Sequence, residues 1–417
     1  MLTLDQIQTV ALAGLVLFVG YGIRRLLPFL TKYNIPAPVV GGLLVATFIT
    51  VSRAYGWTPL AFTTSLQLPL QIAFYTTIGF GASLSLLRVG GPAVLIFFII
   101  SSLMAVGQNV IGVGAAYALG EHPLMGVLAG SVTLTGGPAT GLAFAPLFES
   151  AGVPAAATLA VAAAMAGIVA GGVLGGPIAT WLLGRLGREP LAVRPRGAQA
   201  VAAHVPEVRL DTETPSAPAG EDVESYNLLK ALVLILMAMW MGSWVSAWIT
   251  SLDLNGNGVN DITLPAYIGA MLVAAVLRNL DDATGLIGMS QKMLDDVGGT
   301  ALSLFLVMAL MTLRLWDLVG VALPLAIMLV LQLIAIAVVS ATVVFRVMGR
   351  DYEAAVMAGG FCGFMLGTTA NAMANMEAVV SRYGPAPKAF LVVPMVGAFF
   401  VDFTNALIIT GCLNIWG

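Results

Sequence analysis

Apolar residues occur along the chain in long runs that are separated by short polar segments. A membrane-crossing helix needs about 20 such residues, because each residue adds roughly 1.5 Å along the helix axis. Ten runs approach or exceed this length: Thr9–Leu27, Pro36–Val51, Pro69–Leu87, Ala93–Leu119, Pro154–Leu183, Leu228–Thr250, Pro265–Leu280, Gly298–Leu318, Val321–Phe345 and Lys388–Cys412. The pattern predicts an all-α integral membrane protein with ten or so transmembrane helices.

Two stretches break this pattern with glycine, threonine and asparagine: Gly130–Gly141 after the fourth run and Gly359–Met376 after the ninth. Glycine weakens a helix, and hydroxyl or amide groups that face hydrocarbon lack hydrogen-bond partners. Interrupted segments that occur in pairs are typical of transporter binding sites. We therefore expect two re-entrant elements, not continuous helices, whose tips meet near the membrane midplane. Glycine-rich helix packing without a ligand is the alternative.

The polar segment Gly184–Asn227, which is rich in proline, divides the chain into two halves. The Ile-Pro-Ala triplet at Ile35–Ala37 recurs as Leu-Pro-Ala at Leu264–Ala266, 229 positions further on. Each half has five crossings, and an odd number inverts the second half relative to the first. We predict an N-terminal repeat in residues 1–183, a linker in residues 184–227 and an inverted C-terminal repeat in residues 228–417.

Composition agrees with a membrane protein, because 59% of the 417 residues are apolar and only 9% are charged. Soluble domains carry about 25% charged residues. If the N-terminus is outside, all 18 basic residues except Arg53 and Arg314 lie on the cytoplasmic side. This bias follows the positive-inside rule, so we expect both termini outside and the linker in the cytoplasm. No basic face of the kind that binds nucleic acid is present.

Asp402 is the most informative ionisable residue, because it lies about 21 Å into the last apolar run. An acid at this depth is costly, and the run assignment places no Lys or Arg beside it. We infer that its missing partner is a cationic group of a ligand. Asn405, one helical turn further on, shares the same face. The alternative is an aspartate that only bonds to a neighbouring helix.

Helix N-termini are the expected anion-binding device, because no intramembrane arginine is available. A helix that restarts at either interruption would present free N–H groups, with threonines as additional donors. Unwound carbonyls with threonine and asparagine oxygens suit sodium, and no other cofactor is expected. The predicted substrate-binding residues are Thr135, Gly136, Gly137, Thr140, Gly367, Thr368, Thr369, Asn371, Asp402 and Asn405; the predicted sodium-site residues are Gly136, Gly137, Cys362, Asn375 and Thr404.

Several long strings resemble the bacterial sodium/glutamate symporter family, and the likeness spans nearly the whole chain. They are Lys32–Leu44, Gly130–Gly137, Ala374–Met376 and Val393–Asp402. The resemblance implies sodium-driven uptake of glutamate across the bacterial inner membrane by a homodimer. It also implies a fold like that of the sodium/citrate carriers, in which a mobile domain moves as an elevator.

Both interrupted stretches depart from the pattern of this family. Gly136–Gly141 reads Gly-Gly-Pro-Ala-Thr-Gly where the family usually has Gly-Gly-His-Gly-Thr-Gly, and Phe361 and Met365 replace a usual histidine and glycine. Asp402 is retained. Another small amino acid or a dicarboxylate, carried with sodium or protons, is therefore the alternative substrate.

Other classes of function fit less well. An enzyme is not expected, because the chain lacks His-Glu-x-x-His and Walker A motifs and has only His122 and His204. A channel remains an alternative, since re-entrant pairs also line pores. Asp253–Asp261 has the oxygen spacing of a calcium loop, but position 12 is Leu264, so a plain polar turn is preferred.

Overall fold

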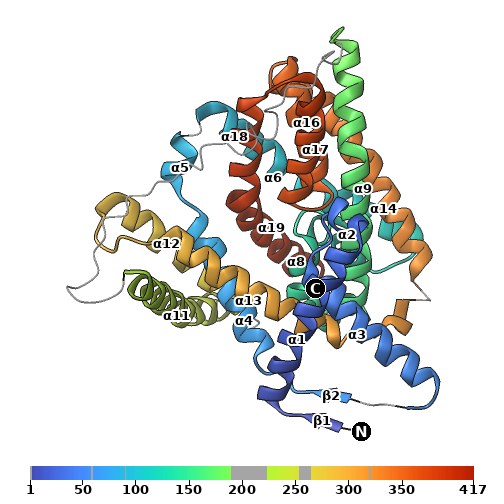
Figure 1. Cartoon of the computed structure of the whole chain (residues 1–417), viewed down its shortest axis with the longest axis vertical. Helices are drawn as coiled ribbons and strands as arrows, with labels where there is room; N and C mark the ends of the chain where they lie inside the picture. The colour runs from blue at the N-terminus through green and yellow to red at the C-terminus, as the bar shows by residue number, and fades with distance from the viewer. Residues whose placement is uncertain (1, 58–59, 90, 189–222, 253–263, 319–320) are drawn as a thin grey trace. The chain divides into compact units, whose positions relative to one another are not determined.

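The computed structural model describes the whole chain except residues 1, 58–59, 90, 189–222, 253–263 and 319–320 (Figure 1). The described residues are almost entirely helical, and their one sheet is a parallel pair of three-residue strands, β1 (Leu2–Leu4) and β2 (Leu60–Phe62). They form two compact units. The first holds the described residues of Met1–Thr31, Ile35–Ser85 and Leu210–Asp317, and the second those of Lys32–Asn34, Leu86–Arg209 and Leu318–Gly417.

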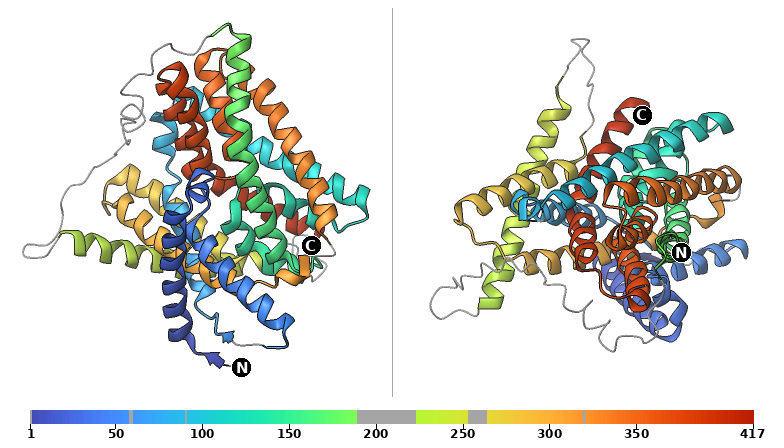
Figure 2. Two further views of the ribbon diagram at one scale, coloured as in Figure 1. Left: turned by 45° about the vertical axis from the view of Figure 1, so that its right-hand side comes forward. Right: turned by 90° about the horizontal axis from the view of Figure 1, so that it is seen from above.

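The first unit is a set of packed helices. They are α1 (Gln6–Leu26), most of α2 (Pro28–Lys32), α3 (Ala37–Ala54), α4 (Gln67–Gly81), α11 (Val223–Thr250), α12 (Ala266–Thr284), α13 (Gln291–Met311) and most of the short η2 (Leu315–Leu318). Helix α4 packs against α12 and α13, and α11 packs against α12 (Figure 2). The short α5 (Leu84–Val89) contains the boundary between the units.

The second unit contains two helical hairpins among longer helices. The first hairpin is α7 (Pro123–Val127), continued by the π-helix η1 (Leu128–Val132), and α8 (Gly137–Ser150). The second is α16 (Tyr352–Met365) and α17 (Thr369–Tyr383). Around them lie α6 (Gly91–Leu119), α9 (Ala156–Arg185), α14 (Ala322–Val339) with η3 (Ser340–Val344) and α15 (Phe345–Val347), and α18 (Pro387–Met395) with η4 (Val396–Phe400) and α19 (Val401–Trp416).

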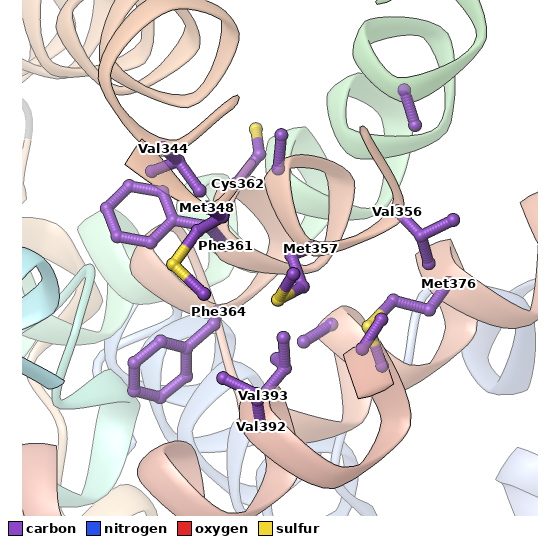
Figure 3. Close-up of a cluster of buried hydrophobic side chains, with 14 of the residues drawn as sticks. Val344, Met348, Val356, Met357, Phe361, Cys362, Phe364, Met376, Val392 and Val393 are labelled. Atoms are coloured by element: carbon purple, nitrogen blue, oxygen red, sulfur yellow. The ribbon is translucent and has the colours of Figure 1, made fainter. Parts of the chain in front are cut away.

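The apolar core of the second unit is centred on α16. Figure 3 shows Phe361 and Phe364 of this helix among buried side chains from neighbouring elements, including Val344 of η3, Met376 of α17 and Val393 of α18. These side chains are almost completely buried, and inside a membrane such contacts stabilise through close van der Waals packing. This core holds the second hairpin in place.

Each of the ten predicted runs overlaps a helix of the described chain. Seven of the described helices are long and apolar enough to cross a membrane: α1, α3, α6, α9, α11, α13, and α14 with its continuation to Val347. The other three runs fall on α4, which has 15 residues, on α12, which ends in charged residues, and on α18 and α19, which η4 separates. A ten-helix arrangement therefore stays a prediction.

Helix starts recur at the displacement found in the sequence. Helix α12 starts at Ala266, 229 positions after α3 at Ala37, and α16 starts at Tyr352, 229 positions after α7 at Pro123. Helices α9 and α11 extend into the predicted linker, to Arg185 and from Val223. The rest of the linker from residue 189 to 222, and the possible calcium loop Asp253–Asp261, lie outside the described residues.

Gly359–Met376 is not a continuous helix, as predicted, but its first glycines do not interrupt it. Helix α16 runs unbroken through three glycines to Met365. A Cβ atom on one of them, Gly363, would lie 2.5 Å from Asn375 Nδ2. These glycines therefore allow close packing, which offsets their cost of about 1 kcal/mol each within a helix. The break follows at Leu366–Thr368.

Helices α6 and α7 touch at two facing glycines, which makes the contact testable. A Cβ atom on Gly112 would lie 2.0 Å from the Gly126 carbonyl oxygen. We expect Gly112→Ala to lower the free energy of unfolding by about 1–3 kcal/mol, the usual cost of overpacking. Thermal unfolding in detergent measures this change. Gly114→Ala on the same helix is the control, because nothing lies within 4 Å of its Cβ position. Equal destabilisation by both substitutions would contradict the contact.

Candidate functional site

The tips of the two hairpins touch each other. The tip of the first hairpin is Thr133–Gly136; Gly130 before it has non-helical dihedral angles, and α8 begins at Gly137. The tip of the second hairpin is Leu366–Thr368. A Cβ atom on Gly137 would lie 3.6 Å from the Gly367 carbonyl oxygen, and Gly137 has the positive φ of 68° that favours glycine. The expected meeting of the two tips is confirmed.

Both tips lead into helix N-termini. Helix α8 starts after Gly136 without a capping side chain, whereas Thr368 caps α17 by accepting the Asn371 N–H at 3.3 Å. The other N–H groups of the first turns, with the positive end of each helix dipole, favour negative charge. Pro138 removes one N–H from the start of α8. Two such ends near one another suit a ligand that carries carboxylates.

The side chain of Gln108, in α6, joins the two tips. It is fully buried, accepts a hydrogen bond from Thr135 Oγ1 at 2.5 Å and donates through Nε2 to the Met365 carbonyl oxygen at 2.9 Å. Gln332 of α14 donates to the Gln108 carbonyl oxygen at 2.6 Å. One amide thus pairs a hydroxyl of the first tip with the carbonyl that ends α16. Without it, both groups would be buried and unpaired.

Two further amides hold the first hairpin. Asn109 Oδ1 accepts the Ser131 N–H at 3.0 Å, and Asn405 Nδ2 of α19 donates to the Ser131 carbonyl oxygen at 2.9 Å. Among the described residues, the buried Ser131 Oγ and Asn405 Oδ1 atoms have no hydrogen-bond partner. A buried polar atom left unpaired costs about 1–3 kcal/mol. Two such oxygens on residues that contact each other are suitable ligands for a small cation.

Two asparagines one turn apart fasten the second hairpin to α9. Asn371 Nδ2 donates to the Ile168 carbonyl oxygen at 2.8 Å, and Asn375 Nδ2 donates to the Gly171 carbonyl oxygen at 2.9 Å. Asn371 is completely buried. Both amide nitrogens therefore serve to position α17.

Asp402 lies in the first turn of α19 and is half-buried. It makes no hydrogen bond or ion pair with any described residue. The chain on either side of it reaches the two hairpins, because a Cβ atom on Gly397 would lie 2.9 Å from Thr369 Oγ1 and Asn405 binds Ser131. Those two contacts are separated by eight residues, or about 12 Å of helix. Asp402 lies on the stretch between them.

The remaining predicted site residues divide into two groups. Thr140 lies beside the first tip, since a Cβ atom on Gly136 would be 2.7 Å from its Oγ1, and Thr404 Oγ1 lies 3.2 Å from Ser102 Oγ. Cys362, in contrast, is buried among the apolar side chains around α16, and Figure 3 shows it there. The structure therefore does not bring Cys362 together with the polar residues of the tips.

The departures from the family pattern lie in different surroundings. Phe361 is fully buried and packs edge-on against Phe97, with ring centroids 5.7 Å apart, so its side chain belongs to the core. Met365 contributes its backbone carbonyl to Gln108, as described above. Pro138 alone changes the set of N–H groups at a helix start.

Several site residues escaped the sequence reasoning. Gln108, Asn109 and Gln332 lie in the middle of apolar runs, and each is almost completely buried. The sequence does mark these residues, because an amide side chain within a membrane helix needs a hydrogen-bond partner just as a charged one does. Asn405 is marked by Asp402 one turn before it, whereas no neighbouring charge marks Gln108, Asn109 or Gln332 in the sequence.

Long apolar helices around two touching hairpin tips, with buried amides between them, define a membrane transport protein of the secondary-carrier class. The family model for sodium/glutamate symporters matches residues 2–385 of the chain. The chain belongs to the sodium/glutamate symporter family.

Individual relatives extend over almost the whole sequence. The sodium/glutamate symporter of Escherichia coli strain K12 is 40% identical over 412 residues, which cover 98% of this chain and 97% of the relative. That of Haemophilus influenzae is 37% identical over 408 residues, covering 98% and 96%. A solved sodium proton antiporter of Methanocaldococcus jannaschii matches with 14% identity and a TM-score of 0.42, covering 99% of both chains.

The bridging role of Gln108 can be tested without a substrate. Gln108→Met removes two hydrogen bonds and leaves two buried groups unpaired, at a cost of about 1–3 kcal/mol. We expect amide hydrogen exchange to accelerate at least roughly tenfold in both hairpin tips, since 1.4 kcal/mol is tenfold. Ser101→Ala is the control, because this buried hydroxyl of α6 has no partner among the described residues. Unchanged exchange in Gln108→Met would show that the tips do not depend on the bridge.

Proposed function

We propose that this protein is a sodium-coupled symporter that takes up glutamate and has no enzymatic activity. The observation that carries the proposal is the pair of helix N-termini at the touching tips, with the unpaired Asp402 on the segment that contacts both hairpins. These groups have the charges that an amino acid with two carboxylates requires. Membership of the sodium/glutamate symporter family supports the same substrate.

In this proposal the carboxylates of glutamate bind at the starts of α8 and α17, and its ammonium group pairs with Asp402. Backbone N–H groups and the hydroxyls of Thr368 and Thr369 donate to the carboxylates. Gln108 and Asn371 act behind the site by holding the two tips. The proposed binding residues are Thr135, Gly136, Gly137, Thr140, Gly367, Thr368, Thr369, Asp402 and Asn405. Asn371, which the sequence also predicts, is instead proposed to position α17.

Sodium requires hard oxygen ligands, and the unpaired Ser131 Oγ and Asn405 Oδ1 atoms are the best supported candidates. Gly136, Gly137, Asn375 and Thr404 remain proposed contributors through carbonyl, amide or hydroxyl oxygens. Cys362 is the weakest member of the original set, because its soft sulfur lies in an apolar cluster. No step of this proposal requires a second cofactor.

Alternating access would follow from movement between the two units as an elevator, with the hairpins in the mobile part and α3 and α12 in the scaffold. We further propose two inverted repeats, in residues 1–183 and 228–417, joined by a cytoplasmic linker. Equal displacements between helix starts support the repeats. The protein would be a homodimer in the bacterial inner membrane with both termini outside, in agreement with the distribution of Lys and Arg.

The substrate has one alternative, another small amino acid or a dicarboxylate. Pro138 favours this alternative substrate, because it leaves the start of α8 with one N–H fewer for a carboxylate. Glutamate remains the first choice, because α17 and Asp402 are unaffected by this change.

Transport into proteoliposomes tests the proposed function. We expect an inward sodium gradient to drive saturable accumulation of labelled glutamate against its concentration gradient, because the proposed sodium ligand Asn405 lies one helical turn from Asp402, which pairs with the substrate. A pH gradient without sodium should drive none. Uptake that follows the pH gradient at zero sodium would contradict sodium coupling, and uptake that never exceeds equilibration would indicate a channel. Excess unlabelled aspartate, glutarate and glutamine then define the substrate range.

Asp402→Asn separates the ammonium contact from other roles of this residue. Removing one partner of a buried ion pair costs about 3–5 kcal/mol, so glutamate affinity should fall at least roughly a hundredfold. Glutarate, which lacks the amine, should lose less affinity. The amide keeps the shape of the side chain, so the thermal unfolding temperature should stay close to wild type. Equal losses for both ligands, measured on purified protein, would show that Asp402 does not bind the ammonium group.

A further inference from the structure

The three residues Lys32–Asn34 have an unusual place in the chain. Both neighbouring segments, Met1–Thr31 and Ile35–Ser85, belong to the first unit, whereas Lys32–Asn34 belong to the second unit. They connect the end of α2 to the residues before α3. The chain thus leaves the first unit for three residues and returns to it.

Asn34 is the main contact of this segment within the second unit. Its Nδ2 donates to Asn371 Oδ1 at 3.1 Å and to the Ala370 carbonyl oxygen at 3.4 Å. Its φ of 54° is in the left-handed region, which asparagine tolerates better than most residues. Beside it, Tyr33 lies against α9, since a Cβ atom on Gly172 would be 3.6 Å from Tyr33 Cδ1.

These contacts end at the start of α17. Asn371 is completely buried, and its own Nδ2 donates to the Ile168 carbonyl oxygen, so Asn34 supplies the donor for its oxygen. Thr368 caps the same turn by accepting the Asn371 N–H. The segment Lys32–Asn34 therefore holds the helix end at which the proposed function binds a carboxylate.

We propose that Lys32–Asn34 is a latch that fixes the start of α17 in one state of the transport cycle and detaches in another. The inference rests on the proposed movement between the units. Each added residue extends a chain by at most about 3.6 Å. A segment of three residues that is attached to the first unit at both ends cannot follow the second unit through a large displacement. Its contacts with Asn371 and Gly172 must therefore break and re-form.

A reversible cross-link tests whether the latch detaches. The double variant Tyr33→Cys with Gly172→Cys replaces two contacting residues, and Gly172 has room for a Cβ atom. We expect protein joined by a short, reductant-cleavable thiol cross-linker to lose sodium-driven uptake and to regain it with reductant. The same treatment should leave the uptake of each single variant at its own untreated level, because the native Cys362 and Cys412 are buried. Full uptake by protein whose cross-link is verified by mass spectrometry would overturn the latch. Failure of the two thiols to cross-link would do the same.

Asn34→Gly tests the contact by removing the amide group that donates to Asn371. Glycine keeps the left-handed backbone and removes only the amide group. We expect amide hydrogen exchange at the start of α17 to accelerate about fivefold or more, and the KM for the transported substrate to rise by a similar factor at nearly constant kcat. Thr31→Ala is the control, because the exposed Thr31 hydroxyl lies just before the latch and donates to the Arg24 carbonyl oxygen. Unchanged exchange in Asn34→Gly would overturn the latch. A failed proposed function would instead appear as absent uptake by the wild type.

Discussion

Buried polar groups at the two hairpin tips need partners inside the protein, because the hydrocarbon core of a membrane offers none. Each tip interrupts a helix and so frees backbone groups that a continuous helix would pair. Gln108 supplies hydrogen-bond partners to both tips, at Thr135 and Met365. Asn109 and Asn405 supply partners to the Ser131 backbone. The arrangement of α6, α19 and the hairpins depends on these few hydrogen bonds.

The lack of hydrogen-bond partners in the membrane also gives meaning to the polar groups that stay unpaired. The protein provides amide partners for nearly all groups around the tips, whereas Asp402 and the Ser131 and Asn405 oxygens lack a partner among the described residues. An acid and neutral oxygens without partners are costly where water is scarce, and a bound ammonium group and a bound cation would each reduce that cost. Coupling between sodium and glutamate then has a physical origin. Asn405, the proposed sodium ligand, and Asp402, the proposed partner of the ammonium group, lie one turn apart on α19.

Much of the fold follows from the apolar pattern, since every predicted run contains a helix and the proline triplets mark the starts of α3 and α12. The contact between the tips also follows from their glycine and threonine content. The continuous α16 does not, because composition cannot show whether a glycine breaks a helix or allows a neighbour to approach, as Gly363 does for Asn375. Gln108 and Asn34 act through residues more than 250 positions away, and a single sequence does not reveal such pairs.

The central claim is that the ligand lies between the helix starts of α8 and α17 and the carboxylate of Asp402. An experimental structure of the purified protein with sodium and glutamate, compared with one prepared without either, tests it most directly. We expect new density that contacts both helix starts and Asp402, with a smaller feature beside Ser131 and Asn405. Glutamate density away from the tips, with Asp402 still unpaired, would show that the ligand binds elsewhere.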